Sequence, residues 1–431
     1  MAESPEFSGS PSALPHRFEQ PSDDPPTLSI VSEFGGLPVL SPFDIQIAAG
    51  PGHIMEMAGG VGGIWRRQGS SATPVRNFTL SSFFRTGPVD DPGLLFDNSS
   101  RRWFATTQDY DNHGFALAVS SGEDPQLSPW TIYRFATPNG RSGDRPIMGI
   151  SANKIVVSVN VPGVSFWIID KNSLLTGGSA NYSIHWRGDA SLLRPVQSLG
   201  STSTVYMVRT FFGATGTPDK IQVFSVTGLP PTPTITNQNI TISDYRLPPY
   251  SAEQLGSNNV IHTTTAYLDD AVWFNGKLWL ALLVGCRAQP NLSCVRLIEI
   301  DTTTYSVTQD FEIPSSAGRY YTFPAMRTNR FGDLIVVFGY SSPSEYPGLM
   351  IAAQTAGDPP GTLEGPVVLI AGTSPTCPGP FVNVTCGFRD YFWRGHRPIG
   401  SDAGVGRRGL WHNESVGNRH SCHRNQIYFE P

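Results

Sequence analysis

An internal repeat limits the folds open to this chain more than any other property of its sequence. Each copy has an Asp or Arg beside a Pro or an apolar residue, then an apolar strand, a small polar turn and a second β-type strand. Two clear copies are Asp91–Asp97 followed by Arg102–Thr106, and Asp144–Ile150 followed by Lys154–Val159. Repetition on this scale is typical of folds that add hydrophobic core one unit at a time.

Seven positions mark the starts of successive copies: Asp44, Asp91, Asp144, Arg194, Asp270, Phe323 and Asp390. They are 47, 53, 50, 76, 53 and 67 residues apart. These spacings fit units of four short antiparallel strands, with insertions in the fourth and sixth units, and they fit no helical repeat. We therefore predict an all-β fold, a β-propeller of seven four-stranded blades over residues 27–431. A Pro/Ser-rich extended arm, residues 1–26, precedes it.

Composition and strand patterns agree with this prediction. The chain has 44 Gly, 37 Pro and only 15% charged residues, which favours short strands joined by tight turns. Near-continuous apolar strands are predicted to be the inner ones, whereas alternating strands such as 131–135 are predicted to be outer ones. We expect Thr27–Val31 to pair with Gln426–Phe429 and close the ring, because closure removes exposed sheet edges.

Two classes of partner are excluded at this stage. The net charge is −5 and no long Lys/Arg cluster is present, so we predict no nucleic-acid binding. The longest apolar run, around Leu278–Val284, is far shorter than the roughly 20 residues of a spanning helix, so we predict no membrane span.

Cysteine placement indicates the secretory route. Cys286 and Cys294 bracket one short loop, Cys377 and Cys386 bracket another, and each pair could form a disulfide. The alternative is four buried free thiols. Cys422, in the run His420–His423, is left over, and it could be a free thiol, an intermolecular bridge or part of a metal site.

Glycosylation signals point the same way. Seven sequons lack Pro at their middle position and begin at Asn77, Asn98, Asn181, Asn239, Asn291, Asn383 and Asn413. Two of them lie inside the proposed disulfide loops, where a bulky glycan would project from a hairpin tip. We predict an extracellular or cell-surface location. The N-terminal segment has no apolar h-region, which argues against secretion if the chain is the whole precursor, although a mature product would also lack one.

Several segments of the chain carry a resemblance to known proteins: Asp44–Gly69, Phe83-Phe84, Asp91–Phe104, Ala118–Ser121 with Asp124-Pro125 and Trp130, and Asp144–Asn160. They resemble a family of uncharacterised secreted β-propeller proteins of bacteria and some eukaryotes. The resemblance covers most of residues 40–410 and implies an extracellular propeller without a defined activity. The closing segment here, Phe388–Phe392, departs from the Arg-Trp-Gly-Asp-Tyr type of that family.

Candidates for chemistry are few. Asp44, Asp91, Asp144, Asp270 and Asp390 recur once per repeat and could surround a central channel. A glycosidase needs carboxylates at only two or three places, so a once-per-repeat Asp is better explained as a turn former. Residues 109–113 resemble the start of a calcium loop but lack its distal Glu, and residues 59–63 predict a flexible hairpin. We predict no catalytic residue, no metal site and no cofactor.

Three functions of different classes remain. The first is an extracellular glycoprotein that acts as a structural or binding module. Its partner would be another copy of the same protein or an extracellular glycan or protein, and it could be a subunit of a filament, sheath or adhesive layer. The second is a carbohydrate-binding propeller that uses surface aromatics. The available tryptophans are Trp65, Trp103, Trp130, Trp186 and Trp393. The third is a polysaccharide-acting glycosidase or lyase.

Overall fold

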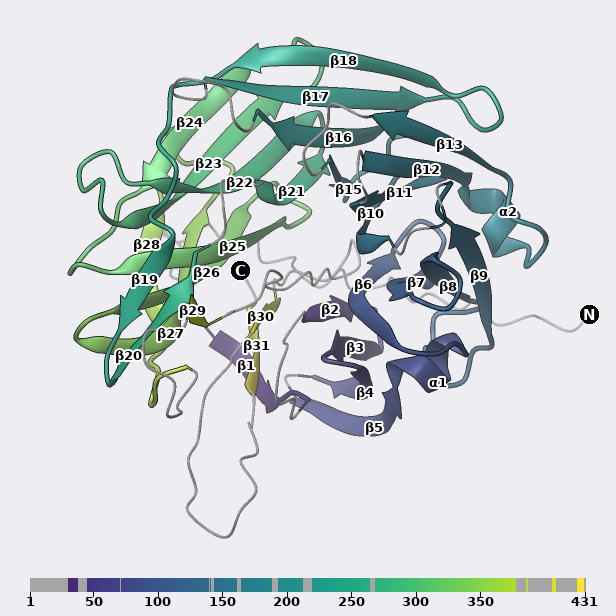
Figure 1. Ribbon diagram of the computed structural model, residues 1–431, viewed down its shortest axis with the longest axis horizontal. Helices are drawn as coiled ribbons and strands as arrows, with labels where there is room; N and C mark the ends of the chain where they lie inside the picture. The colour runs from purple at the N-terminus through teal and green to yellow at the C-terminus, as the bar shows by residue number, and fades with distance from the viewer. Residues whose placement is uncertain are drawn as a thin grey trace, which may run out of the picture.

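The computed structural model is a ring of β-sheets (Figure 1). It describes residues 30–37, 45–69, 71–138, 140, 143–160, 164–187, 193–211, 219–263 and 268–376, and the strand segments 385–386, 405–407 and 425–429. Among these residues the helices are α1 (Leu80–Phe84) and α2 (Lys171–Leu175), of five residues each. Neither is long or apolar enough to cross a membrane. The protein is an all-β β-propeller, as predicted; the arm 1–26 lies outside the described residues.

Four separate sheets have the predicted blade form, in which four strands follow one another. The first sheet consists of β2 (Gln46–Ala49), β3 (His53–Ala58), β4 (Val61–Gln68) and β5 (Ser71–Thr79). The second consists of β6 (Val89–Asp97), β7 (Arg102–Asp109), β8 (Gly114–Ser120) and β9 (Trp130–Ala136). The third consists of β14 (Arg194–Pro195), β16 (Val205–Thr210), β17 (Lys220–Thr227) and β18 (Thr234–Thr241), and the fourth of β25 (Tyr320–Thr328), β26 (Leu334–Ser342), β27 (Glu345–Gln354) and β28 (Glu364–Ile370). Neighbouring strands in each are antiparallel.

A fifth sheet has nine strands. It contains two further four-stranded antiparallel runs: β10 (Asp144–Ile150), β11 (Lys154–Asn160), β12 (Val164–Asp170) and β13 (Tyr182–Arg187), then β21 (Leu268–Phe274), β22 (Lys277–Gly285), β23 (Ser293–Asp301) and β24 (Val307–Ile313). The short strand β15 (Gln197–Ser198) joins them, because it pairs in parallel with both β10 and β21. The innermost strands of two blades are thereby hydrogen-bonded through one connecting segment.

Two three-stranded sheets complete the described fold. One consists of β1 (Ile30–Gly35), β31 (Asn425–Phe429) and β30 (Val405–Arg407), and the other of β19 (Ser251–Gln254), β20 (Ser257–His262) and β29 (Thr385–Cys386). The predicted pairing of the two chain ends is present as β1–β31, with Ile30 opposite Phe429 and Gly35 opposite Asn425. The described part of the N-terminal strand is residues 30–35, so it overlaps the predicted 27–31 at Ile30 and Val31 and continues beyond it; residues 27–29 lie outside the described residues.

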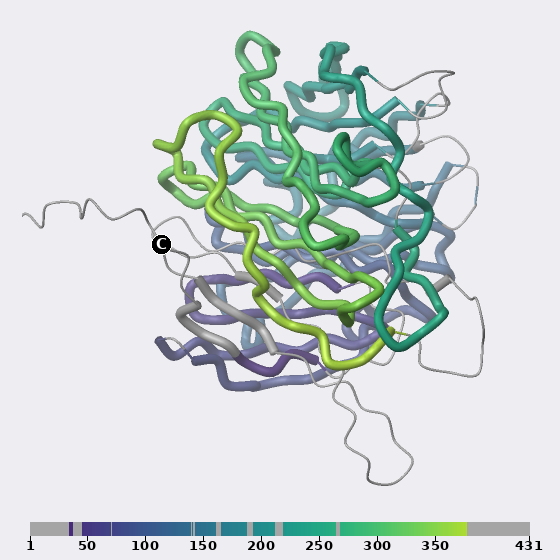
Figure 2. Tube along the Cα trace, turned by 90° about the vertical axis from the view of Figure 1, so that its left-hand side faces the viewer, coloured from purple at the N-terminus to yellow at the C-terminus, as the bar shows by residue number. Residues whose placement is uncertain are grey.

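The hydrophobic core lies between neighbouring sheets. Phe115 of β8 contacts Trp167 of β12 edge-to-face, with ring centroids 4.9 Å apart. Ala325 of β25 packs in one cluster with Ile47 of β2, so strands from late and early parts of the chain share a core. Figure 2, turned by 90° from Figure 1, shows the purple N-terminal strands in the lower part of the view and the teal strands in the upper part. The middle strands, such as β8, are buried along their whole length. Residues 131–135 belong to β9, which is the outermost strand of its sheet as predicted. β13, another outermost strand, alternates between exposed and partly buried residues.

The repeat positions differ from the prediction in one respect. We predicted turns there, but four of them lie at β-bulges or register shifts within innermost strands, at 90–93, 144–147, 268–270 and 322–325. Asp91, Arg145 and Phe323 have positive φ angles of 49°, 54° and 48°, and each precedes a proline. A proline lacks the N–H of a regular ladder, so an inner-edge bulge accommodates it. Asp44 and Asp390 lie outside the described residues.

Candidate functional site

Two of the recurring carboxylates link neighbouring blades. Asp91 Oδ2 accepts a 3.1 Å hydrogen bond from the backbone N–H of Arg145, in the innermost strand of the next blade. Asp270 Oδ2 accepts one of 3.1 Å from Met326 N, again in the next innermost strand. Asp144 instead accepts from Asn160 Nδ2 within its own blade, at 3.0 Å. These carboxylates bind backbone and amide groups, which is a structural role rather than presentation to a substrate.

A buried charged cluster surrounds Asp270. Arg194 Nη2 and Arg327 Nη1 lie 3.3 Å and 2.8 Å from its two carboxylate oxygens. The three residues expose only 1–6% of their surface. Burial lowers the pKa of Arg327, and the adjacent Asp270 opposes that decrease. Such a cluster is stable only while its charges stay compensated, because each guanidinium has lost its hydration.

The neighbouring Asp269 has different electrostatics. Part of the residue is exposed, but its carboxyl group is buried, and Oδ2 accepts a 2.9 Å hydrogen bond from Leu283 N. Burial raises the pKa of Asp269 to about 7, although Arg194 and Arg145 act to lower it. A carboxyl group that titrates near neutral pH can both donate and accept a proton, as general acid–base chemistry requires. The sequence did not single out Asp269; the Asp269-Asp270 pair on an apolar strand was its only signal.

A second feature lies at the opposite ends of the inner strands. The carboxyl ends of β6 and β10, with β15 and the loop after it, enclose a cavity of about 210 Å³. Its lining includes Asp97, Ser151, Gln197 and Ser198. None of these residues was predicted as a site residue, because the cavity forms only when three separate segments meet.

An apolar stripe occupies the free outer edge of one blade. β13 is the terminal strand of the nine-stranded sheet. Tyr182, Ile184 and Trp186 alternate along it and are 44%, 41% and 67% exposed. The intervening His185 faces inward, where it stacks on Phe166 with ring centroids 5.3 Å apart. We call Tyr182, Ile184 and Trp186 the β13 stripe.

The other tryptophans named for carbohydrate binding contribute little surface. Trp65 and Trp103 are core residues that are 3% and 0% exposed. Trp130 is partly buried and packs edge-to-face on Phe83 at 4.9 Å. Trp393 lies outside the described residues.

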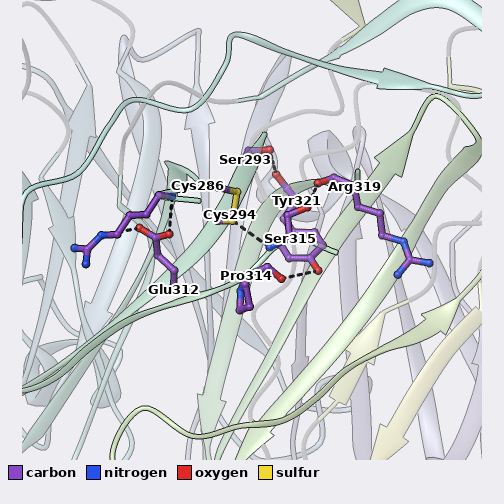
Figure 3. The surroundings of a disulfide bond; sticks show 9 residues. Cys286, Ser293, Cys294, Glu312, Pro314, Ser315, Arg319 and Tyr321 are labelled. Carbon is purple, nitrogen blue, oxygen red and sulfur yellow. Dashed lines mark hydrogen bonds and ion pairs between the residues drawn. A yellow bond between two sulfur atoms is a disulfide. The ribbon is translucent and has the colours of Figure 1, made fainter. Parts of the chain in front are cut away.

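The predicted disulfide between Cys286 and Cys294 is confirmed, with a Cα–Cα distance of 5.0 Å (Figure 3). It closes the β22–β23 hairpin, and Cys286 N also donates to Leu292 O at 3.0 Å. Ser293 Oγ donates a 2.6 Å hydrogen bond to Tyr321 O in the adjacent blade. The side chains of Cys377, Cys386 and Cys422 lie outside the described residues.

Four of the sequon asparagines are exposed: Asn77, Asn181, Asn239 and Asn291. Asn77 and Asn239 are on outermost strands, and Asn291 is in the disulfide loop. Asn98 is partly buried and borders the 210 Å³ cavity. Asn383 and Asn413 lie outside the described residues. Each exposed asparagine could carry a bulky glycan without a change in packing.

The candidate calcium loop is a hydrogen-bonded turn. The Asp109 carboxylate accepts from Thr86 Oγ1 at 2.9 Å and from Asn112 Nδ2 at 2.7 Å, and Arg134 Nε lies 3.5 Å away. Its oxygens are therefore already engaged by donors. Within the part of the chain that the structure describes, no three His, Cys, Asp or Glu side chains are placed to hold a metal ion. The glycine run at 59–63 forms the predicted hairpin, in which Gly59 and Gly60 have positive φ angles.

Comparisons with known proteins give distant matches only. No protein-family model and no curated protein matches the chain. Among solved structures, YjhT is 10% identical and covers 78% of this chain and 100% of its own, with a TM-score of 0.44. A D477G ACO/RPE65 chimera is 8% identical, with coverages of 73% and 69% and a TM-score of 0.44. An endo-arabinase from Bacteroides thetaiotaomicron VPI-5482 is 11% identical, with coverages of 63% and 95% and a TM-score of 0.33. Similarities this weak carry no argument about activity, and the assignment to the propeller fold depends on the strand order.

Proposed function

We propose that this protein is an extracellular β-propeller glycoprotein that serves as a binding and structural module and associates with further copies of itself. The β13 stripe carries this proposal. Monomeric proteins seldom expose neighbouring large apolar side chains, and a free strand edge can pair with another chain. Here both features occur on the same strand.

Most of the other outermost strands are less suited to such pairing. β5 contains Pro74, β28 contains Pro366, and β24 carries Asp310 and Glu312. Prolines and charges on an edge strand oppose edge-to-edge association. β9 carries Arg134, and β18 has neither a proline nor a charge, but the side chains that it exposes are Thr, Asn and Gln.

Between Tyr182 and Trp186, β13 has neither a proline nor a charge, and it exposes large apolar side chains. Among the described outer edges, β13 is therefore the one through which we expect association.

Light scattering after size-exclusion chromatography tests the proposal. The wild-type protein is expected to associate with increasing concentration, and Trp186→Lys is expected to remain monomeric. Leu127→Lys is the matched control, because Leu127 is 76% exposed on another blade and should not affect association. A wild-type protein that is monomeric at high concentration, with residues 1–26 intact, would rule out self-association.

Secretion and glycosylation are part of the proposal. They are supported by the Cys286–Cys294 disulfide, since such bonds persist mainly in oxidising compartments, and by the four exposed sequon asparagines. Asn181 directly precedes β13, so a glycan there would crowd the stripe. We expect Asn181→Gln, expressed in a glycosylating host, to associate more strongly than the wild type. Mass spectrometry of the secreted product tests occupancy directly.

We further propose a ring of seven blades and membership in the secreted propeller family named above. The six four-stranded antiparallel runs account for six blades, and the β1–β31–β30 sheet, which pairs the chain ends, would be the seventh. The family membership is supported by the sequence resemblance alone. An experimental map that resolves the ring tests the blade number.

A second candidate function is cleavage of a polysaccharide, and Asp269 is the observation that favours it. A carboxyl group with a near-neutral pKa can transfer a proton, and Arg194 beside it could stabilise the negative charge that develops in a lyase-type elimination. Activity on a polysaccharide panel should be lost in Asp269→Asn and retained in Asp144→Asn, whose carboxylate bonds within its own blade. A wild-type protein that cleaves nothing on the panel would remove this candidate.

A further inference from the structure

We propose that the 210 Å³ cavity between β6, β10 and β15 binds a single neutral sugar or polyol unit. The inference rests on the proposed binding role of the protein, but not on association through the β13 stripe. We call this cavity the β15 cavity. It lies at the ends of the inner strands farthest from the Asp269–Asp270 cluster, so it is a separate site.

Asp97, at the floor of the β15 cavity, belongs to a compensated ion pair with Lys171. Lys171 Nζ donates to Asp97 Oδ2, Ser99 Oγ and Ser151 O, at distances of 2.9, 2.9 and 2.8 Å. A lysine ammonium has three donors, so all of them are used. Lys171 is 1% exposed and Asp97 is 8% exposed. The floor therefore offers no free charge, which disfavours an ionic ligand.

The walls of the cavity are held by backbone hydrogen bonds. Ile150 N donates to Val196 O at 3.2 Å, and Ala152 N donates to Thr202 O at 2.8 Å. Leu199 N donates to Trp273 O at 2.8 Å, in the next blade. Three segments are thus fixed relative to one another without a ligand. A preformed site loses little conformational entropy on binding.

One polar group in the walls is buried without a partner among the described residues. The Ser198 hydroxyl oxygen has no hydrogen-bond partner. Buried polar side chains nearly always have partners, because an unmade hydrogen bond costs about 1–3 kcal/mol. Gln197, which is 2% exposed, lines the cavity beside it. A ligand with hydroxyl groups could bond to both side chains.

The lining and the volume select the ligand class. An amide and hydroxyls both donate and accept, as the adjacent hydroxyls of a sugar do. Phe96, Ile150 and Leu199 add apolar surface for the C–H face of the ring. A volume of about 210 Å³ has room for one pyranose or cyclic polyol ring.

Isothermal titration with glucose, galactose, mannose, N-acetylglucosamine and myo-inositol tests the proposal on the full-length protein. We expect saturable binding of at least one probe and about tenfold weaker binding for Gln197→Leu, the factor expected from the loss of one strong hydrogen bond. Gln46→Leu is the control, because Gln46 is as deeply buried but lines a different hollow, beside Asp91. The bound sugar should also raise the thermal midpoint of the wild type but not of Gln197→Leu.

A second variant covers the case in which Gln197→Leu does not fold. Ser201 is an exposed residue at the cavity rim, so Ser201→Trp should block entry without disturbing the core. No saturable binding of any probe, or equal binding by Ser201→Trp and the wild type, would overturn the proposal. Trp186→Lys leaves the cavity intact. The proposal of sugar binding can therefore fail while the proposal of self-association holds, and the reverse.

Discussion

The buried cluster around Asp270 gives the sharpest stability prediction. Asp270→Ala removes the carboxylate that faces Arg194 and Arg327, together with the acceptor for Met326 N. Both guanidiniums are more than nine-tenths buried and would lose this compensation. Removal of one partner from a buried ion pair costs about 3–5 kcal/mol. We expect a decrease of that size in the free energy of unfolding.

The assay is urea unfolding monitored by tryptophan fluorescence. The slope of the free energy of unfolding against urea concentration is compared between variants. Glu345→Ala is the control, because Glu345 pairs with Arg319 at 2.6 Å but the two side chains remain 28% and 17% exposed. That pair should contribute about 1 kcal/mol or less to the free energy of unfolding. Arg194→Met with Arg327→Met in the Asp270→Ala background should recover much of the lost stability, since no buried cation of the cluster then remains. Equal costs for Asp270→Ala and Glu345→Ala would refute this reasoning.

Three other predictions address stability. Burial raises the pKa of Asp269 to about 7, against about 3.9 in the unfolded chain, so the folded protein holds this proton more tightly. The free energy of unfolding of the wild type should therefore decrease as the pH rises from about 4 to about 7. Asp269→Asn should lack that loss, and an unchanged pH profile in urea melts would contradict the assignment. Replacement of both cysteines of the β22–β23 disulfide with serine should cost about 2–3 kcal/mol, and reduction of the wild type should shift its urea midpoint equally. Gly114→Ala should cost about 1–3 kcal/mol, because the new methyl group would overlap the Phe135 carbonyl oxygen, whereas Gly52→Ala, in open space, should change the thermal midpoint little.

The blades were predictable because their strands carry local signals. The apolar middle strands and the alternating outer strands have different periodicities, and the Asn275-Gly276 turn defines a hairpin between β21 and β22. β15 and β29 have two residues each, too few for any periodicity. The nine-stranded sheet that β15 creates was therefore not foreseen.

The site was less predictable than the fold, because it depends on groups brought together by the ring. The repeat identified Asp91, Asp144, Arg194 and Asp270, but not that two of these carboxylates bond to the next blade. The near-neutral pKa of Asp269 results from burial, which a local pattern does not encode. Gln197 and Lys171 had no sequence signal. Their importance follows from a cavity and an ion pair that form between distant segments.

Electron microscopy of the purified, secreted particle tests the proposed function most directly. Self-association through the β13 stripe predicts seven-bladed discs that contact one another at the outer edge of the blade formed by β10–β13, with Trp186 at the contact. Trp186→Lys should yield separate discs under the same conditions. Separate discs for the wild-type protein at high concentration, or contacts through another blade, would contradict self-association through the β13 stripe.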